Sequence, residues 1–270
     1  MTKYLGKNIY LLLILFLVGC TPSNQSLKSS SYIPQGFKEQ LVSGTDFTLT
    51  TYQKITSANA PYVFYIEGDG RVATKTGISP DPTPKRPVLI NIMMLDSRPN
   101  IIYIARPCQY SKALNPKCSN NSYWTTKRFA EEVVDNINQV INKISGNKNF
   151  SLVGYSGGGG IAILIASRNQ NVSDIITIGG NLDIKKFTSH HRSLPMKGSI
   201  NPIDYAEKVK FVPQMHLSGE LDRVVPPFIA EEYVLKSSST CVKHKIIKGA
   251  THSRNWEEFW RHYNKQPNCN

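Results

Sequence analysis

The chain has 270 residues, of which 40% are hydrophobic and 19% are charged, and its formal net charge is +13. This length and composition are enough for a sizeable core, built as one large domain or as two smaller ones. The Lys and Arg residues are scattered and no RNP element or Cys/His finger is present, so we expect no nucleic-acid partner. The charge indicates a basic solvated surface, or one that is attracted to anionic lipid head groups.

The first nineteen residues have the pattern of an export signal. Lys3 and Lys7 precede the apolar run Ile9–Val18, which is too short to cross a bilayer as a helix. The run ends in LVGC, residues 17–20, which resembles the lipobox of bacterial lipoproteins, where the signal is cut before the cysteine and the cysteine takes lipid. The resemblance implies residues 1–19 as signal peptide and Cys20 as a lipid anchor in the bacterial cell envelope. An ordinary secretory signal is the alternative.

Cysteine usage agrees with export. The five cysteines are Cys20, Cys108, Cys118, Cys241 and Cys269. Lipidation of Cys20 leaves four, an even set that suits an oxidising compartment. We favour the disulfides Cys108–Cys118 and Cys241–Cys269 because both close local loops; other pairings and free buried thiols remain open. No Cys-x-x-Cys or His-x-x-x-His spacing is present, so we expect no metal site, and no cofactor is implied.

After the signal, a polar, serine-rich stretch predicts a flexible tether over residues 20–44, followed by a folded domain over residues 45–270. Within that domain, short apolar runs bounded by Gly or Pro predict strands at 47–54, 61–68, 100–107, 150–156, 174–180, 214–220 and 243–249. Helical patterns lie at 125–145, 160–167, 226–238 and 255–265. The alternation predicts an α/β fold with a mostly parallel central sheet covered by helices on both faces.

The strand at 150–156 runs into a Gly-x-Ser-x-Gly motif, GYSGG, at residues 154–158. The predicted strand before it and helix after it are the context that a nucleophile elbow requires. Glycine at 154 and 158 lets the sharp turn close and lifts the Ser156 hydroxyl out of the sheet. The helix that follows directs its N-terminal N–H groups at the same place, so the Gly157 N–H is a candidate oxyanion donor. The alternative is a glycine-rich helix start packed tightly on a strand.

A serine nucleophile needs a base, and the base needs an acid that orients it. His252 follows the last predicted strand by a short loop and is the candidate base. Asp222 ends the preceding strand and is the candidate acid, with Glu220 and Asp183 as rivals. A second oxyanion donor is expected from the loop EGDGR after the strand at 61–68, where the Asp69 N–H is the candidate; a tight Asp-Gly turn is the alternative.

These motifs resemble the α/β-hydrolase superfamily over about residues 45 to 270. The resemblance rests on EGDG, GYSGGG, GELDRVVP and GATH in that order. It implies Ser156 as nucleophile, Asp222 as acid, His252 as base, and the N–H groups of Asp69 and Gly157 as the oxyanion hole. One departure is that Glu-Gly stands where many members have His-Gly.

The resemblance implies a serine hydrolase, a carboxylesterase above all, that acts on a small-molecule or lipid-like acyl substrate. An acyltransferase or peptidase on the same triad, or a non-catalytic envelope lipoprotein that uses the scaffold for binding, are the alternatives. Residues 181–212 lie between two predicted strands and are expected to form a small cap. Because the cap is basic, through Lys185, Lys186, His190, His191, Arg192 and Lys197, we expect an anionic substrate or an anionic surface.

Overall fold

The central element is an eight-stranded sheet in the order β1-β2-β6-β3-β7-β8-β9-β10. Its strands are β1 (Lys38–Ser43), β2 (Thr48–Ile55), β3 (Tyr62–Ile66), β6 (Asn100–Ile104), β7 (Phe150–Tyr155), β8 (Val172–Ile178), β9 (Gln214–Gly219) and β10 (Val242–Ile247). From β6 onward in this order, neighbouring strands are parallel, whereas β2 is antiparallel to both of its neighbours, β1 and β6. The predicted α/β class with a mostly parallel sheet is therefore confirmed.

The structure, a computed structural model, describes residue 1 and residues 33–146, 148–263 and 266–269. The predicted signal peptide, Cys20 and the tether as far as residue 32 lie outside the described residues. The tether prediction to residue 44 was too long, because β1 pairs with β2 from Lys38 to Ser43. All six residues of this edge strand are exposed or half-exposed, so its sequence lacks the apolar run that marks a buried strand. No helix in the described ranges has the length and apolarity that a bilayer span requires.

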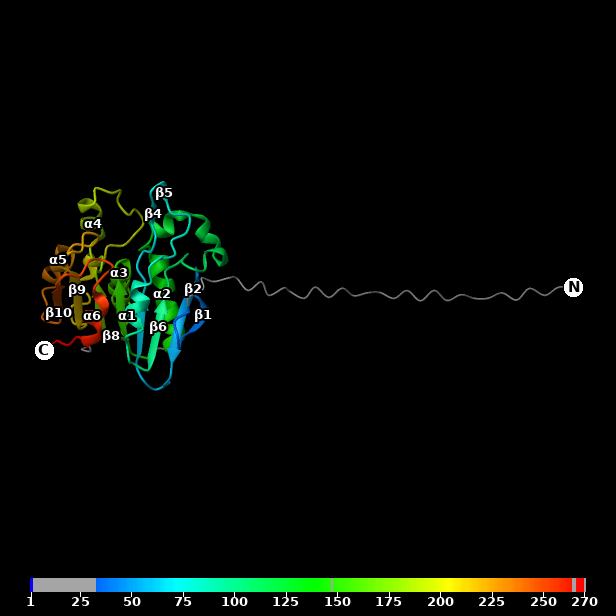
Figure 1. The fold of residues 1–270 in the computed structure, drawn as a ribbon, viewed down its shortest axis with the longest axis horizontal. Coiled ribbons are helices and arrows are strands. Elements are labelled where there is room, and N and C mark those ends of the chain that lie inside the picture. The colour runs from blue at the N-terminus through cyan, green and yellow to red at the C-terminus, as the bar shows by residue number, and fades with distance from the viewer. Residues whose placement is uncertain (2–32, 147, 264–265, 270) are drawn as a thin grey trace.

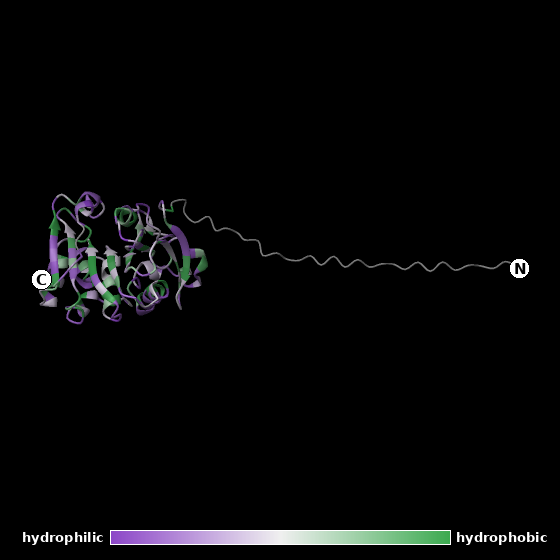
Figure 2. Ribbon diagram, turned by 90° about the horizontal axis from the view of Figure 1, so that it is seen from below, coloured by the Kyte–Doolittle hydropathy of each residue, from purple (hydrophilic) through white to green (hydrophobic). Residues whose placement is uncertain are grey.

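Helices cover both faces of the sheet (Figure 1). They are α1 (Val88–Met93), α2 (Glu131–Ser145), α3 (Gly157–Ala166), α4 (Ile184–His190), α5 (Phe228–Ser237) and α6 (Trp256–His262). Helices α2, α3 and α5 contribute to one hydrophobic core, and α1 and α6 contribute to the core on the other face. Figure 2 shows hydrophobic residues along the middle strands, as expected of strands buried on both sides.

The predicted helix at 125–145 begins later than expected, at Glu131. Two of the residues before it bond to distant segments: the Phe129 N–H donates to Ser199, and the Phe129 carbonyl accepts from the Ile200 N–H. The Arg128 carbonyl accepts from the Arg106 guanidinium. These tertiary contacts replace the first turn of the helix. The sequence did not predict helices α1 and α4 or the hairpin of β4 (Ala73–Thr74) and β5 (Gly77–Ile78). It also did not predict four 3₁₀ turns, η1 (Lys112–Leu114), η2 (Pro116–Ser119), η3 (Asn121–Trp124) and η4 (Pro202–Tyr205).

Two disulfides tie loops to the fold. Cys108 bonds to Cys118, which joins the turn after β6 to η2, with a Cα–Cα distance of 5.6 Å. Cys241, just before β10, bonds to Cys269, with a Cα–Cα distance of 4.0 Å. These are the pairings that the sequence favours. Such bonds persist in oxidising compartments and are typical of exported proteins.

Because β3, β7, β8, β9 and β10 are parallel, their carboxyl ends lie at one edge of the sheet. The loops that follow them carry residues 67–71, Ser156, residues 220–225 and His252. Positions far apart in the chain therefore meet at this edge. In sheets of this kind, ligands bind at the same edge.

Candidate active site

Ser156 occupies a strained backbone position between β7 and α3. Its φ of 51° and ψ of −121° lie outside the regions that residues with a side chain favour. The surroundings hold it there: its N–H donates to the Ile178 carbonyl at 2.9 Å, and its carbonyl accepts from Asn181 at 2.9 Å and Gly159 at 3.0 Å. The turn therefore exposes the side chain at the carboxyl edge of the sheet, as a nucleophile elbow does.

The glycines of the motif are required by close backbone packing. A Cβ on Gly154 would lie 2.4 Å from the Gly158 carbonyl oxygen, and a Cβ on Gly158 would lie 2.1 Å from the Ile66 carbonyl oxygen. Both contacts are far below van der Waals distance and involve backbone atoms that cannot rotate away. Strand β3, strand β7 and helix α3 approach one another this closely only without side chains at these positions.

The structure brings Ser156, His252 and Asp222 together. Nε2 of His252 lies 3.1 Å from Oγ of Ser156, and Nδ1 of His252 lies 2.8 Å from Oδ2 of Asp222. The Asp222 side chain is fully buried, whereas that of His252 is 16% exposed. The other Asp222 oxygen accepts from the Val224 and Val225 N–H groups at 2.8 and 2.9 Å. This bonding fixes the carboxylate with one oxygen directed at the imidazole.

Two further side chains fix the loop that carries the imidazole. The hydroxyl of Tyr155 and the indole N–H of Trp256 both donate to the His252 carbonyl, at 3.0 and 3.1 Å. The rival acids have other partners. Glu220 accepts from the Gly249 N–H at 2.9 Å, and Asp183 accepts from the first N–H groups of α4 and from the Asn201 amide. Asp222 is thus the carboxylate that bonds the imidazole.

The loop after β3 lies against the start of α3. A Cβ added to Gly157 would lie 2.1 Å from Oδ1 of Asp69, so the two predicted oxyanion donors belong to segments in contact. Gly157 is the first residue of α3, and its N–H has no partner within the helix. Within the described ranges, the Asp69 N–H donates to no backbone carbonyl. Both N–H groups remain available to a ligand beside Ser156.

Solved structures provide a comparison for this arrangement. An acylaminoacyl peptidase of Pyrococcus horikoshii is 14% identical, with a TM-score of 0.57, over 84% of this chain and 39% of that one. Est1E of Butyrivibrio proteoclasticus is 12% identical, with a TM-score of 0.59, over 83% and 96%. An esterase of Pyrococcus furiosus is 15% identical, with a TM-score of 0.57, over 84% and 87%. The chain has the α/β-hydrolase fold.

The likeness concerns the fold. The chain spans about two fifths of the length of the peptidase that it matches. No family model matches this sequence, and no curated protein matches it either. A fold of this kind supports many functions, so the function of this chain depends on the residues of its own site.

The loop after β3, which carries the candidate oxyanion donor, is held by Glu67, at the position where the sequence departs from His-Gly. One Glu67 oxygen accepts from the Gly68 N–H at 2.8 Å, and the other accepts from the Tyr103 hydroxyl at 2.8 Å. The Gly68 carbonyl accepts from the Gln109 amide at 3.0 Å. Burial raises the pKa of Glu67 to about 7, against the opposing effect of these hydrogen bonds and of Arg106. At the position of the usual histidine, this chain thus has a buried acid that bonds the loop backbone.

The side chain of Asp69 forms two ion pairs. One oxygen pairs with Arg106 at 3.2 Å, and the other pairs with Arg128 at 2.9 Å. The Arg106 guanidinium is buried and lies over the Phe129 ring at 5.4 Å from its centroid. Burial lowers the pKa of Arg106, and Asp69 opposes that effect. The two cations turn the Asp69 carboxylate toward themselves and fix the backbone whose N–H is the candidate donor.

A cavity of about 620 Å³ opens over Ser156, and we call it the Ser156 cavity. It is lined by Glu67, Gly68, Asp69, Gly70, Arg71, Val72, Pro84, Lys85, Arg86, Val88, Arg128, Tyr155, Ser156, Phe187, His191, Ser193, Val224, His252 and Ser253. The predicted cap contributes only Phe187, His191 and Ser193 to this lining. The largest share of the wall, nine of the nineteen residues, comes from the segment between β3 and α1.

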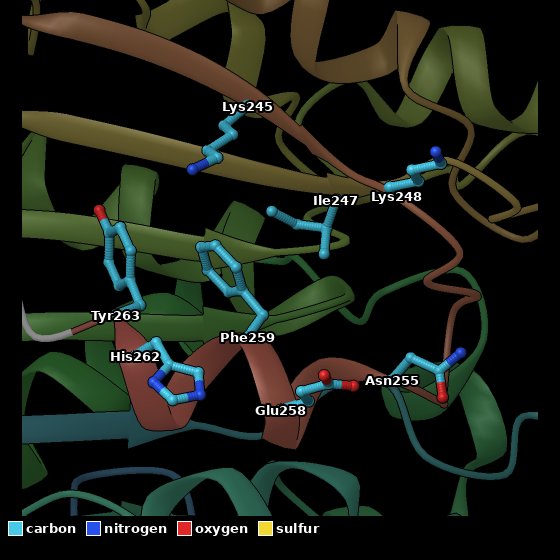
Figure 3. A pocket seen from close by; sticks show the side chains of 8 residues that line it. All are labelled: Lys245, Ile247, Lys248, Asn255, Glu258, Phe259, His262 and Tyr263. Atoms are coloured by element: carbon cyan, nitrogen blue, oxygen red, sulfur yellow. The ribbon is translucent and has the colours of Figure 1, made fainter.

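A second cavity, of about 660 Å³, lies between β10 and α6. Figure 3 shows its side chains, among them Lys245, Phe259 and Tyr263. The Lys245 ammonium lies over the Phe259 ring, 5.2 Å from its centroid. Ser156, Asp222 and His252 do not line this second cavity, so it is separate from the candidate active site.

Sequence reasoning missed several residues of the site, namely Tyr103, Arg106, Gln109, Arg128 and Trp256. A signal existed for Arg106, because it lies two residues after the end of β6, at the carboxyl edge where ligand sites of parallel sheets form. Arg128 had none, since it lay inside a predicted helix. Among the described residues, no cluster of three or more His, Cys, Asp or Glu side chains is arranged to hold a metal ion.

Proposed function

We propose that the protein is a serine hydrolase that cleaves a carboxylic ester through an acyl-enzyme. The observation that carries the proposal is the continuous hydrogen-bonded line from Ser156 through His252 to Asp222, with contacts of 3.1 and 2.8 Å. These distances lie within the range over which a base takes a proton from a nucleophile. The strained turn at Ser156 supports the same role.

The geometry supports a defined sequence of steps. Oγ of Ser156 attacks the ester carbonyl carbon while Nε2 of His252 accepts its proton. The buried Asp222 carboxylate, bonded to Nδ1–H, stabilises the imidazolium that forms. The carbonyl oxygen becomes an oxyanion that the N–H groups of Asp69 and Gly157 are placed to bind. His252 then protonates the leaving alkoxide, and a water molecule releases the acyl group by the reverse steps.

Turnover of a neutral chromogenic ester, 4-nitrophenyl butyrate, tests the proposal. We expect the wild-type protein to hydrolyse it and Ser156→Ala to lower kcat/KM by about 10³-fold or more. Ser119→Ala, which removes a surface hydroxyl on η2 away from the Ser156 cavity, is the matched control and retains activity. Equal turnover by wild type and Ser156→Ala would contradict the proposal, and so would a folded wild type with no turnover of any ester.

We further propose that the protein is exported and anchored by lipid at Cys20. The LVGC sequence after an apolar run supports this, and the two disulfides agree with an oxidising compartment. Metabolic labelling with palmitate tests it. We expect labelled wild type in the membrane fraction and unlabelled Cys20→Ser; labelling that persists in Cys20→Ser would contradict the anchor.

A further inference from the structure

The wall of the Ser156 cavity is strongly basic. Arg71, Lys85, Arg86 and Arg128 all line it, and all except Arg128 belong to the segment between β3 and α1. The Arg86 charge is close enough to oppose the rise in the pKa of Tyr155, the neighbour of Ser156. Positive charge is thus present beside Tyr155 as well as elsewhere on the cavity wall.

The acidic residues of the cavity do not neutralise this wall. Asp69 is shared between Arg106 and Arg128, which leaves that group of three with a net positive charge. Glu67 is buried and its pKa is raised to about 7, so it is partly protonated near neutral pH. In the described ranges, no ion pair involves Arg71, Lys85 or Arg86. These three cations therefore lack a carboxylate partner beside a cavity of substrate size.

The segment that carries the cations is fixed at several points. The Arg71 N–H donates to the Pro82 carbonyl at 2.9 Å, and its Nε donates to Ser79 at 2.9 Å. The Trp124 indole N–H donates to the Ser79 carbonyl at 3.0 Å. A Cβ on Gly70 would lie 2.0 Å from the Pro82 carbonyl oxygen, so the two arms of the segment are in close contact. These contacts hold the part of the segment from Gly70 to Pro82 in place, and the exposed Lys85 and Arg86 follow it along the chain.

The basic cap residues expected from the sequence do not supply this charge. Lys185 pairs with Asp204 at 3.5 Å, and Lys186 pairs with Glu232 at 2.8 Å. Of the six basic cap residues, only His191 lines the Ser156 cavity. An anionic substrate would therefore be recognised by the segment after the oxyanion loop.

We propose that the Ser156 cavity selects esters that carry a negatively charged group, which Arg71, Lys85 and Arg86 bind while the ester carbonyl lies at Ser156. The inference rests on the proposed ester hydrolysis and adds its substrate class. The anionic group can belong to either the acyl part or the alcohol part of the ester. Two pairs of substrates distinguish these two cases.

The acyl pair is the 4-nitrophenyl monoester of adipic acid and 4-nitrophenyl hexanoate; the alcohol pair is 3-acetoxybenzoate and phenyl acetate. For each pair, the ratio of kcat/KM for the anionic ester to that for the neutral ester is measured. We expect at least one ratio to fall about tenfold in Lys85→Gln/Arg86→Gln, about threefold for each charge removed, and to fall in wild type as NaCl rises. Lys197→Gln, which removes a cap charge outside the cavity, leaves both ratios unchanged.

Ratios that are the same in the double variant and in wild type, for both pairs, would overturn the inference while leaving ester hydrolysis intact. If wild type hydrolysed none of the four esters, the proposed function would fail, and binding would decide the inference by itself. For that purpose, calorimetry measures 3-hydroxybenzoate and adipate binding to Ser156→Ala, with and without Lys85→Gln/Arg86→Gln. A rise in Kd of about tenfold in the triple variant supports the inference, and equal Kd values or no binding overturn it.

Discussion

The buried carboxyl of Glu67 makes the stability of the protein depend on pH in a defined direction. Burial raises its pKa from 4.5 to about 7 in the folded protein, whereas in the unfolded chain it keeps the ordinary value. Between these two values the folded state holds a proton that the unfolded state has lost. The free energy of unfolding therefore falls as pH rises from about 4.5 to about 7. At about 1.4 kcal/mol per pKa unit, the full effect is about 3 kcal/mol.

Glu67→Gln removes the titration and keeps an oxygen for the Gly68 N–H. Urea unfolding followed by tryptophan fluorescence measures wild type and variant between pH 4 and pH 8.5. We expect the variant to gain about 3 kcal/mol relative to wild type across this range, because glutamine loses no proton. Glu258→Gln, at an exposed site on α6, is the control and shows no such gain. A constant difference between Glu67→Gln and wild type at every pH would refute the reasoning.

Three further outcomes follow from the site. Asp222→Asn should lower kcat by about 10³- to 10⁴-fold, because it favours the wrong imidazole tautomer; steady-state ester kinetics measure this, and a loss below tenfold would argue against Asp222 as the acid. Gly158→Ala should lower the free energy of unfolding by about 3 kcal/mol, whereas Gly146→Ala, in open space, should cost about 1 kcal/mol; similar urea midpoints would contradict the packing. Tyr103→Phe removes a bond to Glu67, so the pH at which stability falls should move upward in the same urea titration, and an unchanged midpoint would count against that bond.

The fold and the proximity of Ser156, His252 and Asp222 could be predicted from the sequence because local rules and topology agree there. Buried parallel strands are short, mostly apolar runs, as in β7 and β8, and the glycines around Ser156 mark a turn that tolerates no side chains. Parallel strands then place their following loops at one edge. That rule alone brings residues 156, 222 and 252 into one region.

The rest depends on contacts that no local pattern contains. Helix α2 starts at Glu131 because Phe129 bonds to the segment near residue 200, about seventy residues away. Edge strand β1 has a largely polar sequence, like that of a tether, and only its pairing with β2 distinguishes it from one. The basic wall of the Ser156 cavity comes from a segment with little regular structure, so its charges could be assigned to the cavity only once the loop was placed.

The pairing of Ser156 with His252 is tested most directly by covalent labelling with a fluorophosphonate, followed by mass spectrometry of the labelled peptide. In wild type we predict one adduct, on the peptide that contains Ser156. In His252→Ala the same serine is present without its base, so we predict labelling slower by about 10³-fold or more. An adduct on another residue, or equal labelling rates in wild type and His252→Ala, would contradict the account.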